Sequence, residues 1–154
     1  MKRDWIWLIL ALLMLAGGFL LQQSGLLDGR REVIVHQSDC DLRQGACELE
    51  ISGQMVSFLI EPPDIQILQP LKISLSMPEN PVFLPEKVSV QFEGINMDMG
   101  YNRVFLEPVS PGYFQAKGML PACTAETMHW LIHLLVQDSS GTRDYQFRLS
   151  TENR

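Results

Sequence analysis

Apolar and polar residues alternate with a period of two along much of the chain after residue 32. The clearest case is Leu71–Ser76, in which every second residue is Leu or Ile and the residues between them are Lys or Ser. Successive side chains of a β-strand point to opposite faces of a sheet, whereas those of a helix repeat about every 3.6 residues. The pattern therefore predicts strands with one buried face and argues against a mainly helical domain.

Several short runs carry this pattern, and turn residues separate them. Ser52-Gly53, Pro111-Gly112 and Ser139–Gly141 stand between successive runs, and such residues favour tight turns. The expected strands are Val33–His36, Cys47–Ile51, Gln54–Ile60, Leu71–Ser76, Val88–Phe92, Arg103–Val109, Tyr113–Gly118, His129–Gln137 and Arg143–Leu149. The series predicts a mainly β domain, an antiparallel, immunoglobulin-like β-sandwich of two sheets, at residues 33–150, with a tail at 151–154.

The composition agrees with one folded domain and argues against nucleic acid as a binding partner. The chain has 154 residues, of which 46% are apolar and 19% are charged, so it is too apolar to be a disordered protein. Its formal net charge is -6 at pH 7, which is the opposite of the electropositive surface that a nucleic-acid-binding domain needs. We therefore expect no nucleic-acid partner.

The start of the chain is apolar enough to enter a membrane. Trp5–Leu21 contains no charged residue, and Lys2 and Arg3 precede it. With its flank it is long enough to cross a hydrocarbon core of ~30 Å as a helix, and the preceding positive charges favour a cytoplasmic N-terminus. We expect a transmembrane anchor at 1–27 and a linker at 28–32. A signal peptide cleaved near residues 16–18 and a buried core helix are the alternatives.

The three cysteines, Cys40, Cys47 and Cys123, all follow this apolar segment. An export compartment is oxidising and favours disulfides. We expect a bridge between Cys40 and Cys47, which close a short loop, although pairing of either one with Cys123 is also open. Any single bridge leaves one thiol over.

Signatures of catalysis are missing from the sequence. It contains no Gly-x-Ser-x-Gly elbow, no glycine-rich phosphate loop and no Cys/His spacing typical of zinc sites. A thiolate pair of Cys123 with His129 or His133 is the one enzymatic alternative that the residues suggest. We therefore expect that the protein is not an enzyme.

Soft donor atoms gather in two segments. Met97 and Met99 stand two residues apart, so on an extended backbone both thioethers would leave the same face. Met119, Cys123 and His129 form a second group of soft or borderline donors. Thioether and thiolate ligands select Cu(I), so these five residues are the candidate copper ligands. In the competing interpretation the methionines fill gaps in the core and bind nothing, because Met commonly does so.

The layout resembles a group of small, membrane-anchored periplasmic proteins of Gram-negative bacteria, the FixH/YtkA-like proteins. The resemblance depends on the short anchor, the acidic β-sandwich and Pro111-Gly112-Tyr113, and locally on Phe92–Arg103, Leu120–Cys123 and Met128–Trp130. It implies a single-pass inner-membrane protein with its C-terminal domain in the periplasm, and a role in cytochrome oxidase assembly or copper handling. Met97 and Met99 would then occupy the place of the metal ligands.

Two functional hypotheses follow. In the first, the protein is a periplasmic accessory protein that binds Cu(I) and serves a copper protein or a respiratory oxidase. In the second, it is a metal-free interaction module of a membrane complex. The binding surface would then be an exposed sheet edge, or the loops around Asn80–Pro85 and Pro121–Thr127.

Overall fold

The computed structural model describes Trp7 and residues 12–15, 33–78, 81 and 83–152. The chain divides into two units, Met1–Arg31 and Glu32–Arg154. In the first unit Trp7 and residues 12–15 are helical. The expected anchor at 1–27 and linker at 28–32 otherwise lie outside the described residues. Within the described part, no helix has the length and apolar character needed to span a bilayer.

The second unit is built from strands, which confirms the prediction of a mainly β domain. The strands are β1 (Val33–Gln37), β2 (Cys47–Ile51), β3 (Gln54–Glu61), β4 (Leu71–Ser76), β5 (Lys87–Gly94), β6 (Asn102–Ser110), β7 (Tyr113–Gly118), β8 (Thr127–Asp138) and β9 (Gly141–Glu152). The last two strands are longer than the sequence pattern indicates, and β9 extends two residues into the expected tail.

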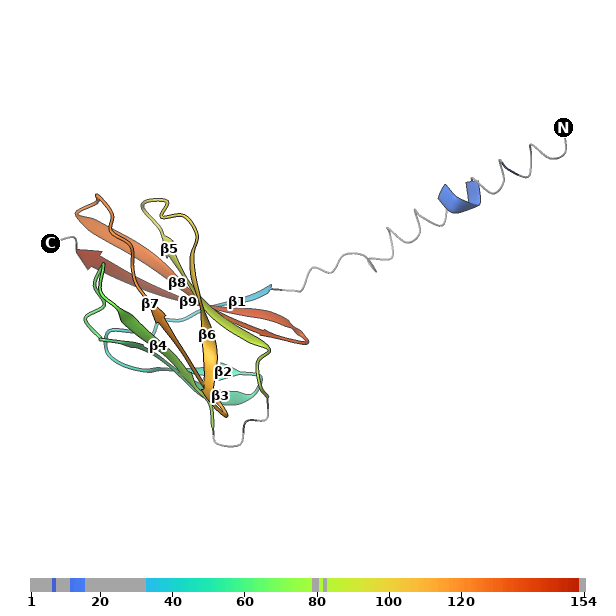
Figure 1. Cartoon of the computed structure of the whole chain (residues 1–154), viewed down its shortest axis with the longest axis horizontal. Coiled ribbons are helices and arrows are strands. Elements are labelled where there is room, and N and C mark those ends of the chain that lie inside the picture. Colours follow the sequence, from blue (N-terminus) through green and yellow to red (C-terminus); the bar gives the residue numbers. More distant parts are fainter. Residues whose placement is uncertain (1–6, 8–11, 16–32, 79–80, 82, 153–154) are drawn as a thin grey trace. The chain divides into compact units, whose positions relative to one another are not determined.

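One continuous sheet contains all nine described strands, in the order β1-β9-β8-β5-β6-β7-β4-β3-β2. The expectation of two separate sheets is wrong, because β6 belongs to both halves. Its first part pairs with β5 through Leu106, and its last part pairs with β7 from Glu107 onward. Figure 1 shows β6 where the two groups of strands meet. We call β1, β9, β8 and β5 the first half-sheet, and β7, β4, β3 and β2 the second.

The sheet curls so that the two half-sheets face each other across the core. The rings of Phe58 on β3 and Phe147 on β9 lie 5.3 Å apart between centroids. The Tyr145 hydroxyl on β9 donates a hydrogen bond of 2.9 Å to the backbone carbonyl of Glu50 on β2. Trp130 on β8 is fully buried between the halves. The alternating residues that predicted the strands thus form one core.

The tight turns occur where the sequence places them. Ser52 and Gly53 both have positive φ, of 52° and 78°, as type I′ hairpin turns require. They join β2 to β3 with Ile51 opposite Gln54. The same physical rule explains why the turn could be predicted, because Gly adopts this backbone region at no steric cost.

The strand pairing is antiparallel except at one edge. β1 runs parallel to β9, with Val33 opposite Thr142 and Gln37 opposite Gln146. All five residues of β1 are exposed. An entirely antiparallel sheet was expected, and β1 differs because a long connection, not a hairpin, separates it from its partner.

The predicted disulfide between Cys40 and Cys47 is confirmed. Cys47 is fully buried at the start of β2, so the bridge attaches the connection after β1 to the core. Cys123 is not part of a disulfide.

The Tyr145 hydrogen bond gives a test of how the half-sheets hold together. In Tyr145→Phe the partly buried hydrogen bond to the Glu50 carbonyl is lost, so the free energy of unfolding should fall by about 1 kcal/mol. Urea unfolding followed by circular dichroism measures the change. Tyr101→Phe is the matched control, because Tyr101 is 74% exposed and its substitution should have no measurable effect. Equal stability of both variants would contradict this bond's role.

Candidate functional site

The predicted methionine ligands lie in a loop, not in a strand. β5 ends at Gly94 and β6 begins at Asn102, and the residues between them carry Met97 and Met99. The apolar–polar alternation of this segment imitates a strand. Gly100 has a positive φ of 67°, and its N–H donates to the Asp98 carboxylate at 2.8 Å, so the segment turns back on itself.

Asn96 fixes this loop against the start of β8. Its side-chain amide donates to the Thr127 carbonyl at 2.9 Å, and its carbonyl oxygen accepts from the His129 N–H at 3.0 Å. The Ile95 N–H also donates to the His129 carbonyl, at 2.8 Å. The amide side chain therefore continues the β5–β8 ladder where the β5 backbone leaves it.

The methionines of the loop pack against the core. A Cβ on Gly94 would lie 2.2 Å from Met128 Cε and 2.9 Å from Met99 Cγ, so both side chains occupy the space above this glycine. Met128 is buried, whereas Met97 and Met99 are partly buried against the core. Met97 and Met99 also line one hollow of ≈ 500 Å³ that opens to solvent.

The other predicted ligands lie nearby at the same end of the sheet. Met119 is 48% exposed, and its carbonyl accepts a 3.3 Å hydrogen bond from the Asn102 side chain. The Cys123 thiol is partly buried and lies 3.8 Å from the Ala125 carbonyl. The His129 ring is exposed on β8, where its Nδ1 lies 2.7 Å from the Ser150 hydroxyl on β9.

The structure thus places four of the five predicted residues in neighbouring loops and the fifth, His129, near the start of β8. Among the described residues, no group of three or more His, Cys, Asp or Glu side chains is arranged to hold a metal ion. A metal at this end would depend on the thioethers of Met97 and Met99.

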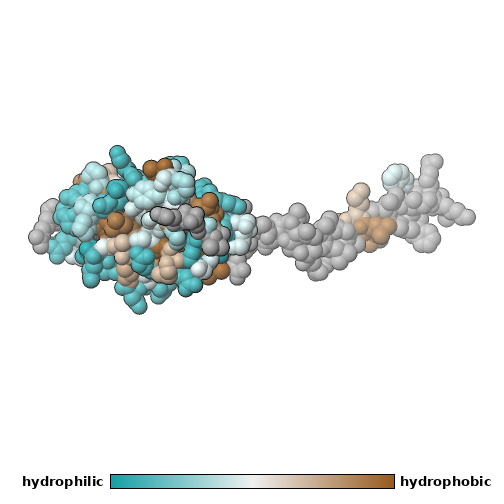
Figure 2. Space-filling model, turned by 90° about the horizontal axis from the view of Figure 1, so that it is seen from below, coloured by the Kyte–Doolittle hydropathy of each residue, from teal (hydrophilic) through white to brown (hydrophobic). Residues whose placement is uncertain are grey.

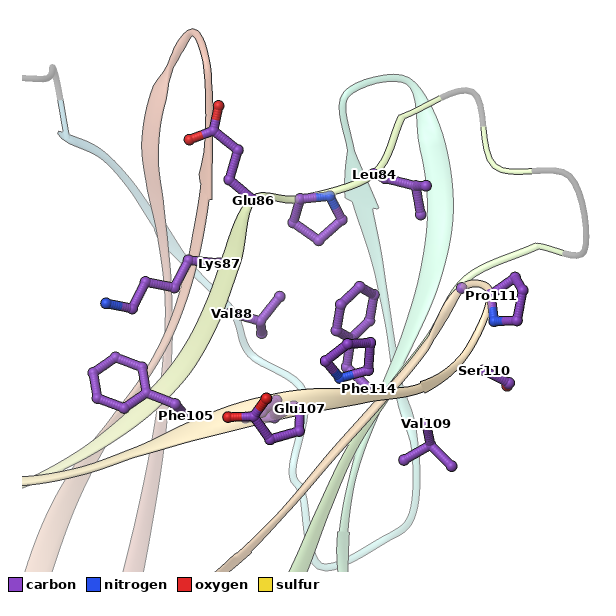
Figure 3. A pocket seen from close by; sticks show the side chains of 14 residues that line it. Leu84, Glu86, Lys87, Val88, Phe105, Glu107, Val109, Ser110, Pro111 and Phe114 are labelled. Atoms are coloured by element: carbon purple, nitrogen blue, oxygen red, sulfur yellow. The ribbon is translucent and has the colours of Figure 1, made fainter.

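The clearest hollow in the domain is elsewhere, between β5 and β6. It measures ≈ 540 Å³, which is within the usual range for a ligand site. Val88, Leu106 and Phe114 are among its buried residues, and Leu84 and Val109 are exposed at its rim, by 57% and 64%. Figure 3 shows Lys87 and Phe105 together at one side of it and Val109 and Pro111 at the other. We call this hollow the groove.

The groove exists because β5 and β6 diverge. Their ladder ends at the pair Val88 and Leu106. Beyond that pair Lys87 lies opposite Gln137 of β8, while Glu107 lies opposite Gln115 of β7. The facing edges of β5 and β6 are consequently not paired with each other at this point. Such a gap results from long-range strand pairing, so the local sequence gives little indication of it. The local signal is Pro108, which lacks the N–H that a paired strand residue donates.

The outward face of the first half-sheet carries a polar network centred on His133. Its Nδ1 lies 2.9 Å from Asp144 Oδ2 on β9, and its Nε2 lies 3.1 Å from Glu93 Oε2 on β5. Asp144 also accepts a 2.9 Å hydrogen bond from the Gln146 side chain. The imidazole is thus held between two carboxylates.

This arrangement shifts the pKa values of both His133 and Asp144. The hydrogen bond with Asp144 raises the pKa of His133 above its ordinary value; burial opposes this effect, and the charges of Asp144 and Glu93 add to it. Burial by itself would raise the pKa of Asp144, but hydrogen bonds from His133 and Gln146 outweigh it and bring that pKa below its ordinary value. The pair therefore favours an imidazolium and a carboxylate.

No protein-family model matches the chain, and no curated protein sequence shows significant similarity to it. The resemblance to FixH/YtkA-like proteins therefore stays a prediction from the quoted segments.

The His133 network predicts a pH-dependent stability. Because folding raises the pKa of His133, its contribution is complete below the ordinary histidine pKa of about 6.5 and is lost as the pH rises through the higher folded-state value. His133→Gln should therefore destabilise the domain more at about pH 5.5 than at about pH 9. Urea unfolding at the two pH values measures this difference. An equal loss at both would show that the network does not act through charge.

Proposed function

We propose that the protein is a membrane-anchored periplasmic accessory protein that acts as a metal-free interaction module. Its groove between β5 and β6 would bind an extended, apolar segment of a partner in a membrane complex. The single observation that carries the proposal is the exposed apolar rim over an unpaired part of the sheet. An extended chain can add its backbone to such an edge and place alternate side chains in a groove.

The surface of the domain supports a localised binding site. Figure 2 shows one face on which hydrophilic residues prevail and hydrophobic residues are scattered. At the groove, by contrast, Leu84, Phe105 and Val109 are all exposed around one hollow. Contiguous exposed apolar residues on a soluble surface usually mark an interaction site.

The strand order supports an immunoglobulin-like description of this module. The order β9-β8-β5-β6 corresponds to strands G-F-C-C′ of that fold, and β3-β4-β7 corresponds to A-B-E. The two groups face each other across one core, as the sheets of that sandwich do. Many cell-surface domains use this architecture for recognition, although fold by itself does not specify function.

Two features support the proposed location. The charge-free segment Trp5–Leu21 follows Lys2 and Arg3, as in an anchor with a cytoplasmic N-terminus. The disulfide between Cys40 and Cys47 is of the kind that persists in an oxidising compartment.

A displayed library of random short peptides tests the groove. We expect the full wild-type chain, in detergent, to enrich a set of peptides from the library. These peptides should bind the Val109→Asp variant at least about tenfold more weakly than the wild type, because an apolar ligand would desolvate the new carboxylate. Fluorescence anisotropy of the enriched peptides measures this. Met55→Asp is the matched control, since Met55 is 54% exposed on β3, away from the groove. Equal binding to wild type and Val109→Asp would contradict the proposal.

Copper handling is a second candidate function, in the assembly of a respiratory oxidase or another copper protein. It is favoured by one observation, that Met97 and Met99 line the same open hollow while only partly buried. Thioethers bind Cu(I) without losing a proton, and Met119, Cys123 or His129 would complete the ligand set.

A Cu(I) titration against a competing chelator tests this candidate. The full chain should bind Cu(I) with sub-micromolar affinity, and Met97→Leu/Met99→Leu should abolish the binding, because leucine keeps the volume and removes the sulfur. Met55→Leu, at an exposed methionine on β3, should bind as the wild type does. Weak binding, or unchanged binding in the double variant, would reject the copper site.

A further inference from the structure

A second, smaller hollow adjoins the groove on the outward face of the first half-sheet. It measures ≈ 250 Å³. Its wall includes polar and apolar side chains of β5, β6, β8 and β9, among them Lys87, Ser89, Arg103, Phe105, Leu135 and Thr142. Lys87 and Phe105 also line the groove, so the two hollows meet at this pair.

The charges of the two hollows differ. Lys87 and Arg103 are the only charged side chains among the described residues that line the smaller hollow. In the groove, Glu86 and Glu107 accompany Lys87. The whole chain has a net charge of -6, so a purely cationic lining is a local exception. The surface is thus positive at one end and contains carboxylates at the other.

Both cations are held in place by uncharged neighbours. Arg103 donates to Gln91 Oε1 from Nε at 3.2 Å and from Nη2 at 2.6 Å. This uses two of the five guanidinium N–H groups and fixes the plane of the fork. Lys87 Nζ lies 4.3 Å from the centre of the Phe105 ring. Cations that are ordered in advance lose little side-chain entropy when they bind an anion.

The acidic residue that interacts electrostatically with Arg103, Asp144, already has hydrogen-bond partners. Asp144 is subject to the charge of Arg103, which is one of the causes that lower its pKa. Its oxygens, however, lie within hydrogen-bonding distance of His133 and Gln146. A ligand carboxylate at Arg103 would therefore meet a guanidinium that is not in a salt bridge with a described carboxylate.

We propose that the two hollows together bind the free C-terminus of a partner polypeptide. The terminal carboxylate would bind Arg103 and Lys87, the preceding apolar side chains would pass Phe105 into the groove, and a basic residue farther upstream would lie near Glu107. The inference rests on the proposed function, since it names the chemistry of the segment that the groove binds. Charge-assisted hydrogen bonds to a carboxylate supply both orientation and affinity.

The experiment presents one random peptide library to the full chain in two formats, with free carboxyl ends and with amidated carboxyl ends. We expect enrichment in the free-carboxyl format, and amidation of an enriched peptide should weaken its binding by about tenfold or more, as loss of a charged hydrogen-bond acceptor does. Arg103→Gln and Lys87→Gln should each remove most of the difference between acid and amide. Lys117→Gln, at an exposed lysine on β7, should preserve it.

The outcomes separate this inference from the function on which it rests. Equal binding of acid and amide, with both lost in Val109→Asp, would overturn the carboxylate site and leave the groove as a binding site. Enrichment in neither format would overturn both. Because Arg103→Gln also removes the hydrogen bonds to Gln91, its unfolding midpoint is measured, and Lys87→Gln keeps the test valid if Arg103→Gln is unstable.

Discussion

β6 is shared by two partner strands, and most other features of the domain depend on this division. Its residues through Leu106 extend the ladder of β5, and its residues from Glu107 extend that of β7. A register shift between Pro108 and Ser110 accompanies the change of partner. Bulges bend a strand and increase its twist. Because β6 changes partner between Leu106 and Glu107, one continuous sheet covers its own apolar face, and Lys87 at the start of β5 is not paired with β6.

The groove is therefore a consequence of the fold and not an addition to it. A sheet that folds over at one strand leaves a gap where that strand turns away from its first partner. Val88, Leu106 and Phe114 are buried at this gap as part of the shared core, so the groove has a rigid base. Rigid placement of exposed apolar groups lowers the entropy lost on binding. This is the physical reason to expect recognition at the gap and not at the exposed edge strand β1.

Alternation and turn chemistry predicted the strands because both are local. Leu71–Ser76 and Tyr113–Gly118 were predicted with the bounds that the structure has, and Ser52-Gly53 forms the expected turn. Alternating residues also occur at Ile95–Tyr101, but the structure has a loop there and not a strand. There the side chain of Asn96 takes the place of backbone pairing, which no periodicity can indicate. Pairing of β6 with two strands is likewise non-local, so the sequence predicted two sheets instead of one.

The candidate site was predictable only in part, for the same reason. Met97, Met99, Met119, Cys123 and His129 do come to one end of the sheet, since Asn96 of the β5–β6 loop is hydrogen-bonded to the start of β8 and Asn102 at the start of β6 is hydrogen-bonded to Met119. Only the thioethers of Met97 and Met99 were expected to share a face of an extended backbone, and the turn at Gly100 removes the basis for that expectation. The groove carries no motif, because its residues come from separate strands, from a turn and from the segment before β5, of which Leu84 and Pro85 belong to the loop that the second hypothesis named.

β5 connects the two candidate regions and also keeps them apart. Lys87 at its start lines the groove, and Gly94 at its end supports the methionine loop. A strand rises by about 3.4 Å per residue, so the two regions are separated by most of the length of an eight-residue strand, roughly 24 Å. Substitutions at Lys87 and at Met97 or Met99, which lie so far apart, should therefore act independently, whereas Arg103 donates hydrogen bonds to Gln91, which lines the methionine hollow. The proposed peptide recognition at one end and the proposed Cu(I) binding at the other are consequently separable, and a test of one does not decide the other.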